Sequence, residues 1–212
     1  MRKPRVLLAD DHHILVDALE KVLEPRFEVV GRVNNGRELL ANAASLQPDV
    51  VVLDIGMPML NGLDACRQLK QQMPRTKFIF LTFHEEPGMM MEAFRAGASG
   101  YVIKRSAVSE LTSAIDTVLR GGGTFVSAAI AGEAMQAIAC NPRKMGAPVE
   151  LTVRQREVVQ LLAEGHSMKE IADILGIAVS TVADHKYHAM EVLQLKTNAE
   201  LYKYAMENAI AS

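Results

Sequence analysis

Five polar residues that could bind a cation and a phosphoryl group follow four short apolar runs of the chain. They are Asp10 and Asp11 after residues 6–9, Asp54 after 50–53, Thr82 after 78–81, and Lys104 after 101–103. Short apolar runs separated by helix-like stretches are typical of buried parallel strands, and ligands bind beyond the carboxyl ends of such strands. Three carboxylates, a hydroxyl and an ammonium should therefore meet at one edge of a sheet. That set of groups suits a divalent cation and a phosphoryl group.

Asp54 is the expected nucleophile, because a carboxylate can accept a phosphoryl group as an acyl phosphate. Asp10 and Asp11, together with Asp54, offer the oxygen ligands that Mg2+ prefers. Lys104 can pair with one phosphoryl oxygen, and the Thr82 hydroxyl can donate to another. The alternative is that the strand-end aspartates only cap the helices that follow them. Capping would not explain Lys104 and Thr82 as well.

Up to about residue 122 the chain alternates strand and helix patterns. This alternation predicts an α/β fold, a doubly wound, flavodoxin-like domain with a five-stranded parallel sheet. The expected strands are residues 5–10, 28–33, 49–54, 78–82 and 100–104. The expected helices are residues 13–24, 36–46, 62–72, 87–96 and 106–120.

Residues 123–147 are less periodic and rich in alanine, so we predict a linker with a short helix near residues 128–138. From residue 151 onward the expected helices are 153–164, 168–175, 181–193 and 198–209. Residues 167–186 have a helix-turn-helix layout, with Gly176 at the turn and Ser180 capping the second helix. The predicted division is a first domain over 4–122, the linker, and a small all-α domain over 148–212.

Several stretches of the first domain resemble the receiver domain of two-component response regulators. The matching stretches are LADDH (8–12), VLDIGMP (52–58), NG (61–62), LT (81–82) and GASGYVIK (97–104). The resemblance implies that Asp54 accepts its phosphoryl group from the phosphohistidine of a sensor histidine kinase. It also implies that Asp11, Asp54 and the backbone carbonyl of Gly56 bind Mg2+, with Asp10 acting partly through water.

The same resemblance identifies Thr82 and Tyr101 as a switch pair, whose side chains reorient when Asp54 is modified. Phosphorylation would then change a surface around this pair and the helix expected at residues 87–96. We expect that change to control dimerisation and DNA binding.

The C-terminal helices resemble the LuxR-type DNA-binding domain, and the two halves together resemble the NarL/FixJ class of response regulators. The matching stretches are LTVRQREV (151–158), KEIA (169–172), STV (180–182) and NAELYKYA (198–205). The apolar pattern of residues 167–186 leaves Ala183, Asp184, Lys186 and Tyr187 outward. The resemblance implies phosphate contacts by Lys169, Ser180, Thr181 and Lys186, and base contacts by Ala183, Asp184 and Tyr187. It also implies that the last helix forms a dimer seam.

The charge of the C-terminal domain is unusual for a DNA-binding domain. From residue 148 onward there are six Lys or Arg and nine Asp or Glu, which gives a net charge of −3. Domains that bind nucleic acids usually carry a basic patch, because phosphate contacts dominate their affinity. We therefore expect weak, salt-sensitive binding by a monomer, with useful affinity only when two copies engage one site.

Composition bounds the remaining possibilities. The chain has 212 residues, of which 49% are hydrophobic, and a formal net charge of −2. It contains no apolar run of about 18 residues, so no membrane span is expected. The apolar run after the basic start is too short for a signal peptide. We expect a cytoplasmic protein with no membrane partner.

The leading hypothesis is a transcription factor rather than an enzyme, phosphorylated on Asp54 with Mg2+ and binding promoter DNA as a homodimer when phosphorylated. An enzymatic alternative is a Mg2+-dependent phosphatase working through Asp54, although no substrate-binding insertion or second acid is visible. A third possibility keeps the receiver but uses the acidic helical domain to bind protein. The sequence leaves open whether the unphosphorylated protein hides its recognition helix against the receiver.

Overall fold

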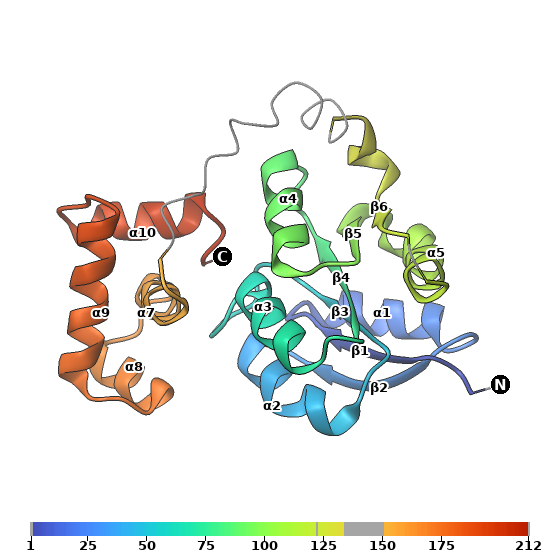
Figure 1. The fold of residues 1–212 in the computed structure, drawn as a ribbon, viewed down its shortest axis with the longest axis horizontal. Coiled ribbons are helices and arrows are strands. Elements are labelled where there is room, and N and C mark those ends of the chain that lie inside the picture. The colour runs from blue at the N-terminus through green and yellow to red at the C-terminus, as the bar shows by residue number, and fades with distance from the viewer. Residues whose placement is uncertain (1, 122, 134–150, 212) are drawn as a thin grey trace.

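The computed structural model describes residues 2–121, 123–133 and 151–211, so the predicted linker lies partly outside the described residues. In the described part of the predicted linker, residues 128–133 are helical. The N-terminal domain is built on a parallel sheet with the strand order β2-β1-β3-β4-β5-β6 (Figure 1). Its strands are β1 (Arg5–Ala9), β2 (Glu28–Val33), β3 (Val50–Leu53), β4 (Lys77–Thr82), β5 (Gly100–Ile103) and β6 (Phe125–Val126).

The sheet has six strands, so the prediction of five was wrong. The additional strand, β6, consists of only Phe125 and Val126, which pair in parallel with Gly100 and Tyr101 of β5. Two residues are too few to produce a period-two signal in the sequence. β6 falls within residues 123–147, which the sequence suggests are a linker, and it forms an edge of the sheet.

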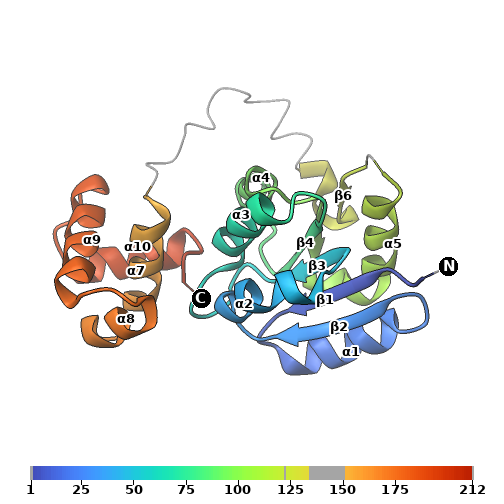
Figure 2. The same cartoon turned by 60° about the horizontal axis from the view of Figure 1, so that its bottom comes forward.

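Helices cover both faces of this sheet (Figures 1 and 2). On one face lie α1 (His13–Leu23) and α5 (Ala107–Leu119); on the other lie α2 (Gly36–Leu46), α3 (Gly62–Gln72) and α4 (Pro87–Ala96). The central strand β3 is buried along its whole length, which explains its uninterrupted apolar sequence. Among the described residues, no helix is long and apolar enough to cross a membrane.

The C-terminal domain is all-helical, as predicted. It contains α7 (Val153–Ala163), α8 (Met168–Leu175), α9 (Val179–Val192) and α10 (Asn198–Glu207). Thr152 caps α7 and Ser167 caps α8, each through a reciprocal capping box with the residue three positions later. Gly176 ends α8 in the left-handed conformation, with φ +63°.

Helix α9 begins two residues earlier than expected. Its cap position is Ala178, which makes no side-chain capping bond, and Ser180 lies inside the first turn. The prediction that Ser180 caps this helix was therefore wrong. Because Val179 continues the helix toward its N-terminus, Ser180 and Thr181 are both presented from the first turn of α9.

The two domains contact each other through α7 and the C-terminal end of the chain. These segments face α3 and the loop between β3 and α3, whereas α9 lies on the far side of its domain (Figures 1 and 2). Met59 of the N-terminal domain packs against the C-terminal core, and Ala209 joins the core of the N-terminal domain. Each domain thus contributes an apolar residue to the other.

Candidate functional site

The strand-end carboxylates meet as the sequence predicts. Asp10 follows β1 and Asp54 follows β3, and the Asp54 backbone N–H donates to the carbonyl of Ala9 at 2.9 Å. Ligand atoms of Asp10, Asp11, His12 and Asp54 all lie within 4.8 Å of one another. Asp10 and Asp54 are 4% and 5% exposed. Parallel pairing of β1 with β3 therefore assembles a compact acidic cluster.

Lys104 supplies the positive charge of this cluster. Its Nζ lies 2.8 Å from Asp10 Oδ2 and 2.7 Å from Asp54 Oδ2, and its side chain is 1% exposed. Burial raises the pKa of the Asp54 carboxyl above its usual value, whereas the charge and hydrogen bond of Lys104 act to lower it. The site therefore holds two buried carboxylates on one ammonium, which leaves excess negative charge for a cation to balance.

Two carboxylate oxygens in the cluster are buried and accept no hydrogen bond: Asp10 Oδ2 and Asp11 Oδ1. Asp10 Oδ2 lies 2.8 Å from the Lys104 ammonium, and Asp11 Oδ1 lies 2.9 Å from His12 Nδ1. Buried oxygens without donors are costly unless another charged group neutralises them. Oxygen ligands of this kind fit Mg2+.

Thr82 and Tyr101 both bind the backbone of His84, in the segment between β4 and α4. Thr82 Oγ1 accepts a hydrogen bond from the His84 N–H at 3.2 Å, and Tyr101 Oη donates to the His84 carbonyl at 2.9 Å. Both side chains are buried, and burial raises the pKa of the Tyr101 hydroxyl. The pair suggested by resemblance therefore converges on one short segment, and the role of His84 in it was missed from the sequence.

The loop that carries Asp54 and Gly56 is held by a close approach at Gly62, the first residue of α3. The Gly62 N–H donates to the carbonyl of Ile55 at 2.9 Å. A Cβ atom at Gly62 would lie 1.9 Å from the carbonyl oxygen of Asp54. Only glycine fits here without displacing the backbone that carries the candidate phosphoacceptor.

Gly62→Ala should therefore destabilise the N-terminal domain. We expect a loss of about 2 kcal/mol in the free energy of unfolding, because the added methyl group meets backbone rather than a flexible side chain. Thermal melting followed by circular dichroism would measure it. Gly88→Ala is the matched control, since a Cβ at Gly88 meets nothing within 4 Å. Equal melting temperatures for both variants would contradict the steric argument.

Helices α8 and α9 form the predicted helix-turn-helix, and most of its candidate DNA contacts are accessible. Lys169, Ser180 and Asp184 are exposed, Thr181 and Ala183 are partly exposed, and Tyr187 is 61% exposed. The receiver does not cover these side chains in this arrangement.

The position of Lys186 differs from the predicted one. It is only 7% exposed and lies on the inner side of α9 with Val182, Ala189 and Met190. Residues four and three positions apart share one helix face, so position 186 must follow Val182 and Ala189 inward. The outward placement of Lys186 was wrong.

Sequence reasoning also missed a polar face of α7. Glu157, Gln160 and Glu164 lie at helical spacing, and the first two are buried although they stand among apolar residues. They contact the N-terminal domain rather than solvent. The available signal was the spacing of three and four between these polar residues, beside the apolar residues of the same helix.

Comparison with known families agrees with this geometry. The model of the response regulator receiver domain matches residues 6–116, and that of the luxR family of bacterial regulatory proteins matches residues 149–205. The chain belongs to the two-component response regulators, and its combination of domains is that of the NarL/FixJ class. It is a transcriptional regulator with a LuxR-type DNA-binding domain, not an enzyme.

Similar proteins span the whole chain. The transcriptional regulatory protein MctR of Rhizobium johnstonii is 34% identical over 99% of this chain and 96% of its own length. The oxygen regulatory protein NreC of Staphylococcus carnosus is 31% identical, covering 97% of this chain and 98% of its own. RcsB of Salmonella enterica serovar Typhimurium, bound to promoter P1flhDC with the phosphomimetic BeF3−, has a TM-score of 0.61 and 25% identity. That match covers 99% of this chain and 100% of the RcsB chain.

Proposed function

We propose that phosphorylation of Asp54 by a sensor histidine kinase controls dimerisation and promoter binding by this regulator. The observation that carries the proposal is the convergence of Asp10, Asp11, Asp54 and Lys104 at one sheet edge. A carboxylate nucleophile beside a buried ammonium provides what phosphoryl transfer to Asp54 requires. The receiver is proposed to span residues 4–122 and the DNA-binding domain residues 148–212.

The carboxylate oxygens of the cluster fit a magnesium site. We assign Asp11, Asp54 and the Gly56 carbonyl as direct ligands, with Asp10 acting through water. Bound Mg2+ would neutralise charge on the phosphoryl oxygens.

The chemistry follows from the positions of the side chains. A carboxylate oxygen of Asp54 attacks phosphorus, the bond from phosphorus to the donor imidazole nitrogen breaks, and the imidazole leaves. Lys104 then exchanges its 2.7 Å contact with Asp54 for a phosphoryl oxygen. The Thr82 side chain turns so that its hydroxyl donates to another phosphoryl oxygen, and this turn moves Oγ1 away from the His84 N–H. Loss of that bond frees the segment that Tyr101 also holds, and this is the proposed switch.

The output is proposed to be DNA binding through α8 and α9. We propose that Lys169, Ser180 and Thr181 contact phosphates and that Ala183, Asp184 and Tyr187 face bases; all six side chains are exposed or partly exposed. A solved structure of the similar protein RcsB is bound to promoter P1flhDC with BeF3−, which supports DNA binding as the output. We further propose that α10 forms the dimer seam, which predicts inverted-repeat half-sites.

DNA binding can be tested by selection from a pool of random-sequence duplexes at low salt, with Mg2+ and BeF3− present. We expect enrichment of inverted repeats by the wild type. Lys169→Glu should weaken binding at least about tenfold, because it replaces one phosphate contact by a repulsive charge. Lys21→Glu on α1 is the control for net charge and should bind like the wild type.

If the wild type enriches no sequence, the acidic C-terminal domain acts through protein contacts instead. Its net charge of −3 is the observation that favours this second candidate function. Equal binding by Lys169→Glu and the wild type would remove Lys169 from the interface.

A further inference from the structure

Helix α7 presents two polar side chains to the loop between β3 and α3. Gln160 is 1% exposed; its Nε2 donates to the Met57 carbonyl at 3.0 Å, and its Oε1 accepts from the Asn61 N–H at 2.8 Å. One turn later, the Glu164 carboxylate accepts from the Met59 N–H at 3.1 and 3.2 Å. We call Gln160 and Glu164 the loop clip.

The clip binds backbone groups only, and these belong to the loop that begins at Asp54. Met57 directly follows Gly56, whose carbonyl is a proposed magnesium ligand. Gln160 also donates to Glu164 at 2.7 Å, so the two clip residues support each other. When the buried polar groups on both sides of a contact are all hydrogen-bonded, the two surfaces can fit together in only one geometry.

The loop conformation that the clip holds is one that a free chain would not favour. Met59 has φ +67°, a left-handed conformation that is costly for a residue with a side chain. Its N–H is bound by Glu164, and its side chain packs against the core of the C-terminal domain. Contacts from the C-terminal domain therefore offset backbone strain inside the phosphoacceptor loop.

We propose that Gln160 and Glu164 are positioning residues for the phosphorylation site. By fixing the loop, they preorganise the Gly56 carbonyl and the Asp54 backbone, so Mg2+ binds more tightly when α7 is docked. This inference rests on the proposed function. In this docked arrangement the side-chain ligand atoms of the acidic cluster lie within 4.8 Å of one another, close enough to share one cation. Linkage makes the coupling reciprocal, so bound Mg2+ must favour docking by the same factor.

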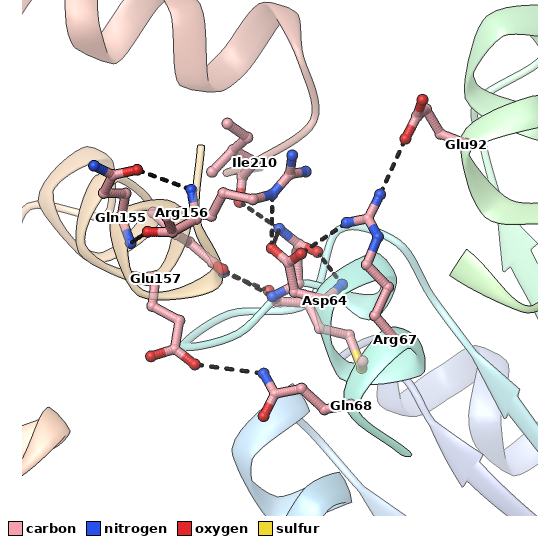
Figure 3. A network of polar contacts seen from close by, with 12 residues as sticks. Asp64, Arg67, Gln68, Glu92, Gln155, Arg156, Glu157 and Ile210 are labelled. Atoms are coloured by element: carbon pink, nitrogen blue, oxygen red, sulfur yellow. Dashed lines mark hydrogen bonds and ion pairs between the residues drawn. The ribbon is translucent and has the colours of Figure 1, made fainter. Parts of the chain in front are cut away.

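A separate set of contacts at the same interface supplies a control. Arg156 of α7 lies 3.1 Å from Asp64 of α3, and Arg67 joins Asp64 to Glu92 of α4 (Figure 3). Gln68 of α3 donates to Glu157 of α7 at 3.5 Å. Gln68 thus bears a carboxamide at the interface, like Gln160, but bonds a side chain of α7 rather than the loop.

The test is a Mg2+ titration of the full-length chain, followed by amide NMR signals of the loop. Gln160→Ala should raise the dissociation constant roughly three- to tenfold, because it removes both loop hydrogen bonds and part of their combined free energy is coupled to Mg2+ binding. Gln68→Ala should change it by less than about twofold. Equal Mg2+ affinity of Gln160→Ala and the wild type would overturn the proposal. A wild type that binds no Mg2+ would instead overturn the proposed function.

Glu164 provides an independent measurement should Gln160→Ala fold poorly. Glu164→Ala removes the acceptor of the Met59 N–H and should weaken Mg2+ binding several-fold. Glu164→Gln keeps a carbonyl oxygen at the same place and should restore the affinity nearly to that of the wild type. Equal affinities of the alanine and glutamine variants would show that the acceptor does not position the loop.

Discussion

Asp54→Asn should abolish phosphorylation of the chain by a small-molecule phosphodonor in the presence of Mg2+. The amide cannot form an acyl phosphate, so incorporation should fall from about one phosphoryl group per chain to background. Intact-mass spectrometry or phosphate-affinity gels would measure it. Asp17→Asn, on the exposed surface of α1, is the control and should be phosphorylated like the wild type. Full incorporation into Asp54→Asn would show that another residue is the acceptor.

The same variant should also be more stable than the wild type at neutral pH. Burial raises the pKa of Asp54 in the folded protein, so the folded state holds the proton more tightly than the unfolded chain. The resulting stabilisation is complete below the unfolded pKa, near 3.8, and is lost as pH rises through the raised folded pKa. Asparagine carries no charge to desolvate. The melting temperature of Asp54→Asn should therefore exceed that of the wild type at pH 7, and the difference should vanish near pH 3.

Lys104→Ala should have the largest effect on stability. Asp10 and Asp54 both face Lys104 Nζ within 2.8 Å, and its removal leaves two buried like charges together. Breaking a buried ion pair by removing one partner costs about 3–5 kcal/mol. Chemical denaturation at pH 7 without divalent ions would measure the loss. An unchanged free energy of unfolding would mean that other groups neutralise the Asp10 and Asp54 carboxylates.

Two conditions should reduce the loss of stability in Lys104→Ala. Acidification protonates Asp54, whose pKa rises further without Lys104, so the variant should approach the wild type as pH falls. Saturating Mg2+ should restore stability at pH 7 by replacing the lost positive charge. With Mg2+ bound, the variant should still accept a phosphoryl group from a phosphodonor. It should fail to dimerise, because no ammonium group is present to pair with the phosphoryl oxygen. Normal dimerisation would remove Lys104 from the switch.

The arrangement of the domains bears on how phosphorylation could act. Tyr187 on α9 is 61% exposed, so the docked receiver leaves the recognition surface open. α7 and the end of the chain carry the contact, with Asn61 Nδ2 reaching the carbonyl of Ile210 at 3.5 Å. Regulation in this arrangement would act on domain docking and on the dimer seam proposed for α10, rather than by covering the recognition helix.

Much of the N-terminal domain could be predicted from local patterns. Each buried strand is an apolar run that ends in a polar residue, and the topology of parallel sheets places those ends together. For that reason Asp10, Asp54, Thr82 and Lys104 could be assigned to one site from the amino-acid sequence. Capping boxes and the glycine at position 176 likewise identified the start of α7 and the turn after α8.

Errors arose where the deciding contact was not local. β6 is two residues long and forms only because β5 offers a free edge. Lys186 was placed outward from the apolar pattern of the helix pair, whereas the packing of α9 against α7 buries it. The start of α9 was predicted from a single residue, Ser180, as its cap. The helix instead extends back to Val179, because nothing in residues 178–180 prevents helical backbone.

The amino-acid sequence by itself determined the convergence of the strand-end acids and the helix-turn-helix layout, because periodicity, caps and strand ends are short-range properties. The class of protein followed from the resemblance of its motifs to those of response regulators. Only the tertiary structure decided that Gln160 and Glu164 hold the loop of Asp54, and that Met59 takes a left-handed conformation against another domain. Those contacts join residues about a hundred positions apart. Their formation depends on two complete surfaces fitting together, and such a fit leaves no repeating signal along the chain.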